Sequence, residues 1–514
     1  MFVEELAQEI ESWKSDSLRL IKVPLTKDYV SRSEAYLLLK QLSEILKDGG
    51  SESEQRRTVG LCFDDPKNWT LAILAAQLAR VVAVPIPREF TIRQISSFVP
   101  NLDLILTDSQ AMGARLDSLL GNRGTRESHP FGISTLFAVK AGANDSRSLN
   151  LPHDAAAVIH TSGSTDDPKG VVISEHGLAT VVHSMRERME SLKGIHYASV
   201  LPMSLLLEQI LGVFLPALSR GSVSILPRAI DCYTGTQSGL DVYLGTIKDC
   251  GANFSMVPPS FLAELRKLAE GSGKRPRTYL GHQLKIIATG GAPIDIACLE
   301  YFRDNEVEIY QGYGLSENTS VVAWTYPGPN VLGSVGQLLP HNQVRINADG
   351  QVEVRGNALF LGYVSNGKFV ARASEWLNTG DNGHFDAEGC LHISGRDSNL
   401  IVLSSGRNVS PEWIESKFKS LPGVKEILVM GHGKPFLSAL VLVKKGYECH
   451  AALNEISDFS ENIKSELPEF SRIRAFRAIP FDDGYYSVSG RVLRKHVLEK
   501  HRDLVEEIYT EKRM

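Results

Sequence analysis

The chain has 514 residues, of which 43% are hydrophobic and 22% charged, and its formal net charge is −5 at pH 7. This length exceeds what one compact core holds, so we expect two to four domains of about 100–200 residues each. The negative charge excludes a general nucleic-acid binder, which needs a concentrated basic surface. The six cysteines are scattered without a C-x-x-C pair, which argues against a disulfide framework and favours a reducing compartment.

Neither a secretory signal nor a membrane span is expected. The first twenty residues are acidic and lack the apolar core of a signal peptide. The longest apolar stretch, SLLLEQILGVFLPALS at 204–219, is interrupted by Glu208 and Gln209 and is shorter than the roughly 20 residues that span a bilayer. These features predict a cytoplasmic protein without a transmembrane segment.

From about Arg57 to Tyr310, short β-rich runs alternate with helical patterns. A helix is predicted over 69–81, and strands are predicted over 59–63, 82–86, 198–202, 222–227, 252–258 and 284–290. This alternation is typical of βαβ units and of mostly parallel sheets. The fold class is therefore α/β, with layered and mostly parallel αβ subdomains.

After Gly312 the pattern changes to hairpins and then to a small α+β unit. The segments 344–356 and 383–395 each read as two strands around a glycine turn. A helix is predicted over 411–420, strands over 424–430, 437–443 and 473–479, and further helices between and after them. We therefore expect a large N-terminal domain over 1–396, with a β-rich part at about 325–396, and a small C-terminal domain over 397–514.

The stretch HTSGSTDDPKGVVIS (160–174) is the first candidate site. Its small and hydroxylated residues allow close backbone approach to a ligand, and Lys169 adds a cation suited to phosphate oxygens. A Walker loop would place the lysine after the second glycine and start a helix there. Here Lys169 precedes Gly170, Pro168 blocks a helix, and a strand pattern follows. The segment is either a different nucleotide loop or an ordinary turn between strands.

This loop resembles the phosphate-binding signature of the AMP-forming acyl/adenylate ligase superfamily, which includes acyl-CoA synthetases, luciferases and peptide-synthetase adenylation domains. The resemblance covers essentially the whole chain, because further motifs follow in the family's order. These are TGGAPI (289–294), YQGYGLSEN (310–318), LNTGDNGHF (377–385) and SGRDSNLIVLSSGRNVSPEWIE (394–415). The motifs look most like those of fatty-acyl-CoA ligases.

The resemblance implies a site for MgATP. Glu317 would bind Mg²⁺ as a hard oxygen ligand, with the hydroxyl of Thr161 nearby. Asp381 would bind the ribose hydroxyls and Arg396 would contact the ribose. The remaining residues implied in nucleotide binding are Ser162, Gly163, Ser164, Thr165 and Lys169 at the phosphates, Gly290, Gly291 and Ala292 at the adenine pocket, and Gln311, Gly312, Tyr313, Gly314 and Ser316 in the motif that carries Glu317. Taken singly, Glu317 could be a surface glutamate, Asp381 a turn residue and Arg396 a salt-bridge arginine.

The implied chemistry explains why such residues are needed. A carboxylate is a poor electrophile, and its attack on the α-phosphate of ATP converts it to an acyl-AMP with a good leaving group. Two anions approach each other in this step, so the site must supply positive charge. Lys169, Glu317 and Arg491 are the implied catalytic residues.

Three positions depart from the family pattern. Arg491, in SVSGRVLRKHV (487–497), occupies the place of a lysine that bridges the substrate carboxylate and ATP. Arginine keeps the charge but has a longer, planar head. Alternatively, Arg491 is a solvated loop residue, and Arg494 or Lys495 could compensate. Ser398 stands at the expected hinge of a mobile C-terminal domain. Leu205 replaces a histidine common in the fatty-acyl branch, unless this leucine only packs in the core. The same segment lacks the aspartate that amino-acid-activating relatives use against a substrate ammonium, so an uncharged acyl or aryl pocket is favoured.

These observations leave three hypotheses open. The first is a ligase that activates a small-molecule carboxylic acid with ATP and Mg²⁺ and transfers it to CoA, with Gly406 near the pantetheine tunnel. The second is an acyl-AMP ligase that loads the phosphopantetheine of an acyl-carrier protein or diverts the adenylate. The third is a non-catalytic protein that binds a nucleotide or an acyl-adenylate. A homodimer is compatible with each, since dimers are common among such enzymes.

Overall fold

The computed structural model describes most of the chain. The described residues are 2–24, 26–47, 56–88, 90, 92–120, 125–131, 134–140, 149–161, 168–192, 194–225, 237–292, 294–328, 331–396, 399, 401–403, 408–409, 411–464, 467, 469–486 and 492–510. Within this part of the chain, no helix has both the length and the apolar character needed to cross a membrane.

The first large sheet has nine strands with a parallel centre. The parallel neighbours are β8 (Ala155–Thr161), β4 (Val82–Pro85), β3 (Thr58–Cys62) and β5 (Leu104–Thr107). Antiparallel strands extend it on both sides: β9 (Lys169–Ser174), β19 (Gly362–Ser365) and β20 (Lys368–Ala371) beyond β8, and β7 (Ser134–Lys140) and β6 (Thr125–Phe131) beyond β5. Every residue of β3 and β4 is buried, as expected for parallel strands covered on both faces.

The second large sheet also has nine strands. Its parallel series is β14 (Ile309–Tyr313), β13 (Ile286–Gly290), β12 (Phe254–Val257), β10 (His196–Ser199), β11 (Ser222–Ile225) and β1 (Arg19–Val23). The antiparallel strands β15 (Ala323–Trp324) and β16 (Gln337–Leu338) close one side, and β2 (Asp28–Ser31) closes the other. The α/β class predicted from the alternating pattern is confirmed, with parallel strands central and antiparallel strands at the edges.

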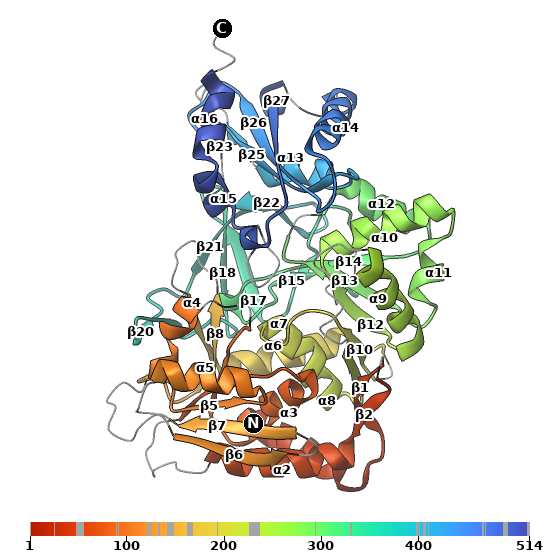
Figure 1. Cartoon of the computed structure of the whole chain (residues 1–514). Coiled ribbons are helices and arrows are strands. Elements are labelled where there is room, and N and C mark those ends of the chain that lie inside the picture. The colour runs from red at the N-terminus through yellow and green to blue at the C-terminus, as the bar shows by residue number, and fades with distance from the viewer. Residues whose placement is uncertain are drawn as a thin grey trace.

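Helices form three layers around the two sheets (Figure 1). The layer between the sheets contains α1 (Phe2–Glu11), η1 (Ser12–Ser15), α2 (Arg32–Lys47), α3 (Pro66–Leu78), α6 (Glu175–Arg188), α7 (Leu206–Gln209), the π-helical turn η4 (Ile210–Phe214) and α8 (Leu215–Leu218). The outer face of the first sheet carries α4 (Ile92–Ser96), η2 (Val99–Asn101) and α5 (Gln110–Leu120). The outer face of the second carries α9 (Gln237–Cys250), α10 (Pro259–Ser272), α11 (Pro276–Leu280) and α12 (Ile296–Asp304).

The sequence of α3 shows why it takes the central layer. All of its residues from Asn68 to Gln77 are buried, and a helix that is apolar on every side must be covered on every side. Its start is fixed locally, because Asp65 accepts a hydrogen bond from the backbone N–H of Lys67 and Pro66 occupies the first turn.

A smaller antiparallel sheet follows, with the order β17 (Asn342–Ile346), β18 (Gln351–Gly356), β21 (Leu377–Phe385) and β22 (Leu391–Arg396). The two predicted hairpins are confirmed, with Gly350 and Gly389 at positive φ in their turns. One feature was not predicted. The chain leaves this sheet after β18, forms β19 and β20 in the first large sheet, and returns as β21.

The C-terminal elements, blue in Figure 1, lie at one end of the molecule. β25 (Val424–Met430), β26 (Leu437–Val443) and β27 (Ile473–Ile479) form a three-stranded sheet, and β23 (Ile401–Val402) pairs with β24 (Asn408–Val409). The remaining elements are η5 (Ser316–Asn318) earlier in the chain and, here, α13 (Pro411–Phe418), α14 (Cys449–Asn462), η8 (Glu469–Ser471), η9 (Asp483–Tyr485), α15 (Arg494–Lys500) and α16 (Arg502–Thr510). The predicted strands match β25, β26 and β27.

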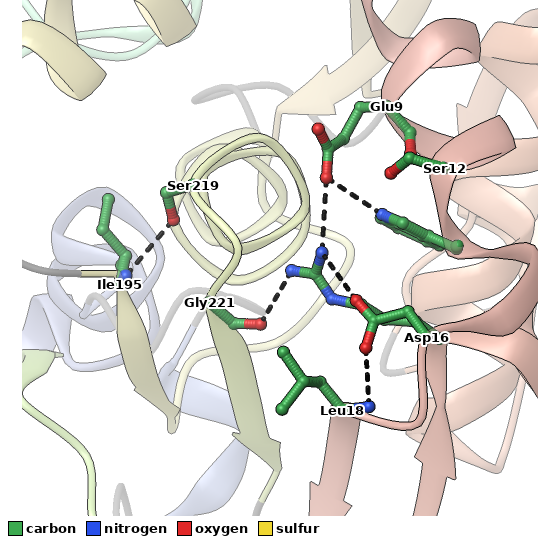
Figure 2. Close-up of polar contacts among 9 residues, drawn as sticks. Glu9, Ser12, Asp16, Leu18, Ile195, Ser219 and Gly221 are labelled. Atoms are coloured by element: carbon green, nitrogen blue, oxygen red, sulfur yellow. Dashed lines mark hydrogen bonds and ion pairs between the residues drawn. The ribbon is translucent and has the colours of Figure 1, made fainter.

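A buried arginine joins the N-terminal helices to the second sheet through Glu9, Asp16 and Gly221, which Figure 2 labels. The guanidinium of Arg32 is 1% exposed and lies 3.3 Å from Glu9 and 3.7 Å from Asp16. It also donates to the carbonyl oxygen of Gly221 at 3.3 Å and packs over the ring of Trp13. Because a buried charge must be paired, this cluster fixes α1 and α2 against the start of β11.

A second polar cluster connects α10 to the C-terminal part. Lys444 Nζ donates to Glu264 Oε1 at 2.5 Å, and Lys267 Nζ donates to the carbonyl oxygen of Leu421 at 3.0 Å. Lys267 also lies 3.6 Å from Glu264. Burial is the main cause of a lowered pKa of Lys267. We call these four residues the α10 bridge.

Candidate active site

The glycines of two motifs bring the carboxyl ends of β13 and β14 together. Gly290 pairs with Gly312, and a Cβ on Gly290 would lie 2.5 Å from the Gly312 carbonyl oxygen. Gly291 has a φ of +77°, which disfavours side chains. A Cβ on Gly314 would lie only 1.5 Å from the carbonyl oxygen of Ser320. Gly290 and Gly314 are required because backbone occupies the space that a side chain would need, and Gly291 because of its backbone conformation.

The other predicted residues of these two motifs differ in burial: one makes a buried structural contact, and the others are partly or fully exposed. Gln311 is buried, and its side-chain amide donates to the carbonyl oxygen of Ser334 at 2.7 Å, which ties β14 to the loop before β16. Ala292 is exposed and Ser316 is half-buried. The glycines at Gly290, Gly291 and Gly312 leave the paired ends of β13 and β14 without side chains at these three positions, which suits the approach of a flat ring to the backbone.

Tyr313, Asp381 and Arg396 come from three motifs and meet at one point. Asp381 is 5% exposed; its Oδ2 accepts from the Tyr313 hydroxyl at 2.6 Å and its Oδ1 from Arg396 Nε at 3.1 Å. Asp381 and Arg396 face each other across β21 and β22. Burial and the neighbouring carboxylate raise the pKa of Tyr313, so the phenol stays a donor. The carboxylate is thereby fixed in orientation, and its remaining lone pairs can accept hydroxyl protons.

Glu317 lies in η5, on the short turn that follows β14. Its Oε1 accepts a hydrogen bond from the Tyr363 hydroxyl at 3.0 Å, and its backbone carbonyl accepts from the Phe360 N–H at 2.8 Å. Tyr363 belongs to β19 and pairs with Val171 of β9, the strand that begins with the exposed Lys169. The structure therefore links Glu317 to the strand that carries the predicted phosphate lysine.

Buried polar residues hold the turn behind Glu317. Asn318 is fully buried and donates to Asn342 Oδ1 at 3.1 Å, while Thr319 Oγ1 donates to the carbonyl oxygen of Ala358 at 2.6 Å. Thr319 and Ser320 have φ values of +48° and +90°, which are rare for residues with a side chain. Strained residues of this kind persist where surrounding contacts over-determine them, and they are frequent at functional sites.

Several buried polar atoms around this region have no hydrogen-bond partner in the described part of the protein. Such atoms are rare, and each calls for an explanation such as a missing polar ligand. Four of them directly precede or follow a predicted nucleotide-binding residue in sequence: His160 Nδ1, Thr289 Oγ1, Asn318 Oδ1 and Asn382 Oδ1. Together with the Asp381 carboxylate, which Tyr313 and Arg396 orient, these unpartnered atoms are the features of the described residues that fit a polar ligand with hydroxyl groups, such as ATP.

The residues also fit a magnesium ion that is held mainly by its nucleotide. No group of three or more His, Cys, Asp or Glu side chains in the described ranges could enclose a metal. Magnesium in nucleotide sites usually takes one or two carboxylates, phosphate oxygens and water, so Glu317 alone could provide the protein's share.

Some predicted residues lie outside the described residues. They are Ser162, Gly163, Ser164, Thr165, Ser398, Gly406 and Arg491, and the side chain of Thr161 shares this status although its backbone ends β8. Their roles stay predictions.

Among the leucines of 204–219, Leu206 belongs to the core between the sheets and Leu207 packs against it.

Sequence reasoning missed two residues. Tyr363 gave no signal because its contact with Glu317 joins strand β19 to the turn η5, which lies 46 residues earlier in the sequence. Glu208 was noted only as an interruption of an apolar stretch, yet its carboxyl is fully buried and accepts from Tyr197 at 2.7 Å and Ser199 at 2.5 Å. Burial raises the pKa of Glu208 to about 8. A charged residue inside an apolar stretch was the available signal, since buried carboxyls need partners.

The two layered sheets and the small α+β C-terminal part define the fold of an adenylate-forming enzyme. The solved structures of MatB from Rhodopseudomonas palustris with ATP bound and of o-succinylbenzoate coenzyme A synthetase from Bacillus subtilis with ATP and magnesium have TM-scores of 0.75 and 0.71. Both are 20% identical; the first comparison covers 98% of this chain and 100% of that one, the second 96% and 98%.

Sequence comparison then gives the family. The AMP-binding enzyme family matches residues 16–364, and its C-terminal domain matches 398–513. The chain therefore belongs to the AMP-binding enzyme family, the adenylate-forming ligases of the acyl-CoA-synthetase type that its motifs predicted. The long-chain-fatty-acid–CoA ligase of Mycobacterium bovis is 26% identical over 416 residues, 69% of each chain. The 2-succinylbenzoate–CoA ligase of Listeria monocytogenes is 29% identical over 293 residues, 54% of this chain and 56% of that one.

Proposed function

We propose that this protein activates a carboxylic acid whose acyl part is uncharged, a fatty acid in the first instance, as an acyl-AMP. It then transfers the acyl group to CoA. The observation that carries the proposal is the contact of Tyr313 and Arg396 with the buried Asp381. Three motif residues that the resemblance assigned to one nucleotide site converge on a carboxylate oriented to accept ribose hydroxyls. Asp381 is only 5% exposed, so it is not an ordinary surface carboxylate that is kept in place by solvation.

The proposed reaction has two balanced steps. In the first, a carboxylate oxygen of the acid bonds to the α-phosphorus of ATP while the bond to the β-phosphate oxygen breaks, which releases pyrophosphate. In the second, a thiolate bonds to the acyl carbon and the bond to the AMP oxygen breaks, and the thiol proton passes to solvent. Magnesium, when bound, would neutralise part of the phosphate charge.

The residues have distinct proposed roles. Lys169 holds the outer phosphates, Glu317 holds the metal, Asp381 accepts from the ribose and Arg491 attracts the acid carboxylate toward the α-phosphate. Each role places charge where the first step needs it, because two anions must approach each other. Gly406 leaves room for the pantetheine arm in the second step.

The choice of an uncharged acid rests on two observations. The segment 204–219 contributes apolar residues and a fully buried Glu208, which leaves no free acidic group there for a substrate ammonium. Relatives named as long-chain-fatty-acid–CoA ligases match 69% of the chain. An aryl acid is the competing substrate, because the 2-succinylbenzoate–CoA ligase matches at a higher identity over a shorter span.

The test is pyrophosphate release with MgATP against fatty acids of graded length, aryl acids and amino acids, each with and without CoA. We expect release with fatty acids that increases when CoA is added. A rate of pyrophosphate release that does not change when CoA is added would favour a carrier-protein acceptor or a diverted adenylate. Absence of release with every acid, while ATP still binds, would favour the non-catalytic hypothesis.

Arg491 provides a sharper arm of the same test. Arg491→Ala should abolish acid-dependent pyrophosphate release, whereas Arg275→Ala, which removes an exposed arginine paired with Glu306, should not change it. An active Arg491→Ala variant would remove Arg491 from the mechanism. A large gain in Arg491→Lys over a nearly inactive wild type would favour the non-catalytic hypothesis.

A further inference from the structure

We propose that Tyr363 is a positioning residue for the metal carboxylate: its hydroxyl fixes one oxygen of Glu317 so that the second oxygen is presented to Mg²⁺. This inference rests on the proposed role of Glu317 and deepens it. The hydroxyl donates to Oε1 at 3.0 Å. Among the described residues, this is the one hydrogen bond to the Glu317 carboxylate that the structure shows, so Oε2 is left for a ligand.

The phenol that makes this bond is itself held in place. Its ring packs edge-on against Phe360, which is 3% exposed, with centroids 4.7 Å apart. Tyr363 is anchored in β19 between β9 and β20, where it pairs with Val171 on one side and Val370 on the other.

This anchoring also relates the metal carboxylate to the phosphate lysine. Val171 lies two residues beyond Lys169 on β9, so one pair of strands carries both the lysine and the phenol that orients Glu317. Magnesium in general demands nearly ideal octahedral geometry, and here it would be held by Glu317 close to the phosphates that Lys169 would contact. A fixed relation between the two side chains therefore matters more here than at a flexible calcium-type site.

Removing the phenol hydroxyl should affect the carboxylate and not the main chain. The backbone of Glu317 is held separately by the Phe360 N–H at 2.8 Å, and the following turn by Thr319 and its bond to Ala358. Tyr363→Phe keeps the ring and its packing against Phe360. The expected result is a rotationally free carboxylate on an unchanged backbone, because hydrogen-bond partners of metal ligands act mainly through orientation.

The test measures metal affinity directly. Mn²⁺ is used as the probe, and its binding in the presence of a non-hydrolysable ATP analogue is followed through the EPR signal of free Mn²⁺. Loss of such a partner typically lowers metal affinity by about 10–100-fold, so we expect Tyr363→Phe to weaken Mn²⁺ binding at least about 10-fold. The Mg²⁺ concentration for half-maximal pyrophosphate release should rise by a similar factor, with a smaller change at saturating Mg²⁺.

Two further variants make the result decisive. Tyr36→Phe removes a comparable hydroxyl that donates to Glu11 at 3.2 Å, far from the site, and should leave metal affinity unchanged. Glu317→Gln should weaken metal binding, and adding Tyr363→Phe to it should produce no further loss, because the two residues act through one contact.

The possible failures are distinguishable. If Glu317→Gln weakens metal binding but Tyr363→Phe does not, the positioning role is overturned and the role of Glu317 stands. If Glu317→Gln leaves metal binding unchanged, the metal assignment of Glu317 fails and the inference falls with it. If both single variants weaken binding and their effects add, Tyr363 acts independently of Glu317, which also overturns the inference.

Discussion

Glu208→Gln is expected to make the protein more stable than the wild type at alkaline pH and about equally stable near pH 5. The Glu208 carboxyl is fully buried beneath β10 and accepts from Tyr197 and Ser199. Burial raises its pKa from 4.5 to about 8, against the lowering effect of these donors. Glutamine keeps the shape of the side chain and cannot ionise.

The magnitude follows from the difference between folded and unfolded states. Between pH 4.5 and about 8 the folded protein holds a proton that the unfolded chain has lost, so the free energy of unfolding decreases as pH rises. The slope approaches 1.36 kcal/mol per pH unit, and over this interval the loss totals about 5 kcal/mol as an order of magnitude. For a cooperative unit of roughly 400 residues this corresponds to about 5 °C in Tm. The contribution of Glu208 to the free energy of unfolding is therefore fully present below pH 4.5 and is lost progressively up to about pH 8.

The assay is the difference in Tm between wild type and Glu208→Gln, measured from pH 5 to pH 9. The matched control is Glu306→Gln, because Glu306 is 82% exposed in its side chain and its substitution should give a difference that hardly varies with pH. A difference for Glu208→Gln that stays constant from pH 5 to pH 9 would refute the reasoning. It would mean that the donors around Glu208 outweigh burial and keep the carboxylate ionised.

Two other substitutions test the domain contact and the glycine-rich strand ends. Lys444→Ala removes the ion pair with Glu264 in the α10 bridge and should speed the release of the C-terminal part in limited proteolysis, with less than about 1 kcal/mol lost in stability. Lys445→Ala, which changes an exposed neighbour, should be cleaved at the wild-type rate. Gly314→Ala should abolish soluble expression or activity, because its Cβ would lie 1.5 Å from a backbone oxygen, while Gly271→Ala in α10, with open space around it, should be neutral or slightly stabilising in Tm. Equal behaviour within either pair would contradict the corresponding contact.

Local pattern predicted much of the fold because local forces decide it. The strands 424–430, 437–443 and 473–479 match β25, β26 and β27, since each is a β-rich run bounded by turn residues. The hairpin around Gly350 follows from its turn chemistry. By contrast, 204–219 forms two short helices joined by a π-helical turn, and Gly212 within it lies against the ring of Tyr197. That shape depends on packing between sheets, which periodicity does not encode.

In the candidate site, too, some residues could be predicted from the sequence and others could not. Asp381, Arg396 and Tyr313 could be placed together because each lies in a motif whose role the resemblance implied. Tyr363 could not, because its contact with Glu317 depends on the pairing of β19 with β9. Sequence spacing carries no information on which distant strand will occupy a sheet edge.

The pairing of β19 with β9 also has a consequence for how the protein is made. Tyr363 pairs with Val171, about 190 residues earlier, so the edge of β9 has no partner until β19 leaves the ribosome. At translation rates of about 5–20 residues per second, that interval lasts roughly 10–40 s. An uncovered strand edge can pair with other chains during this time. The edge of the lysine strand is thus covered late, by β19, and only β20 is added to the first sheet after it. The yield of folded protein in the cell should therefore depend on chaperones and on the speed of synthesis.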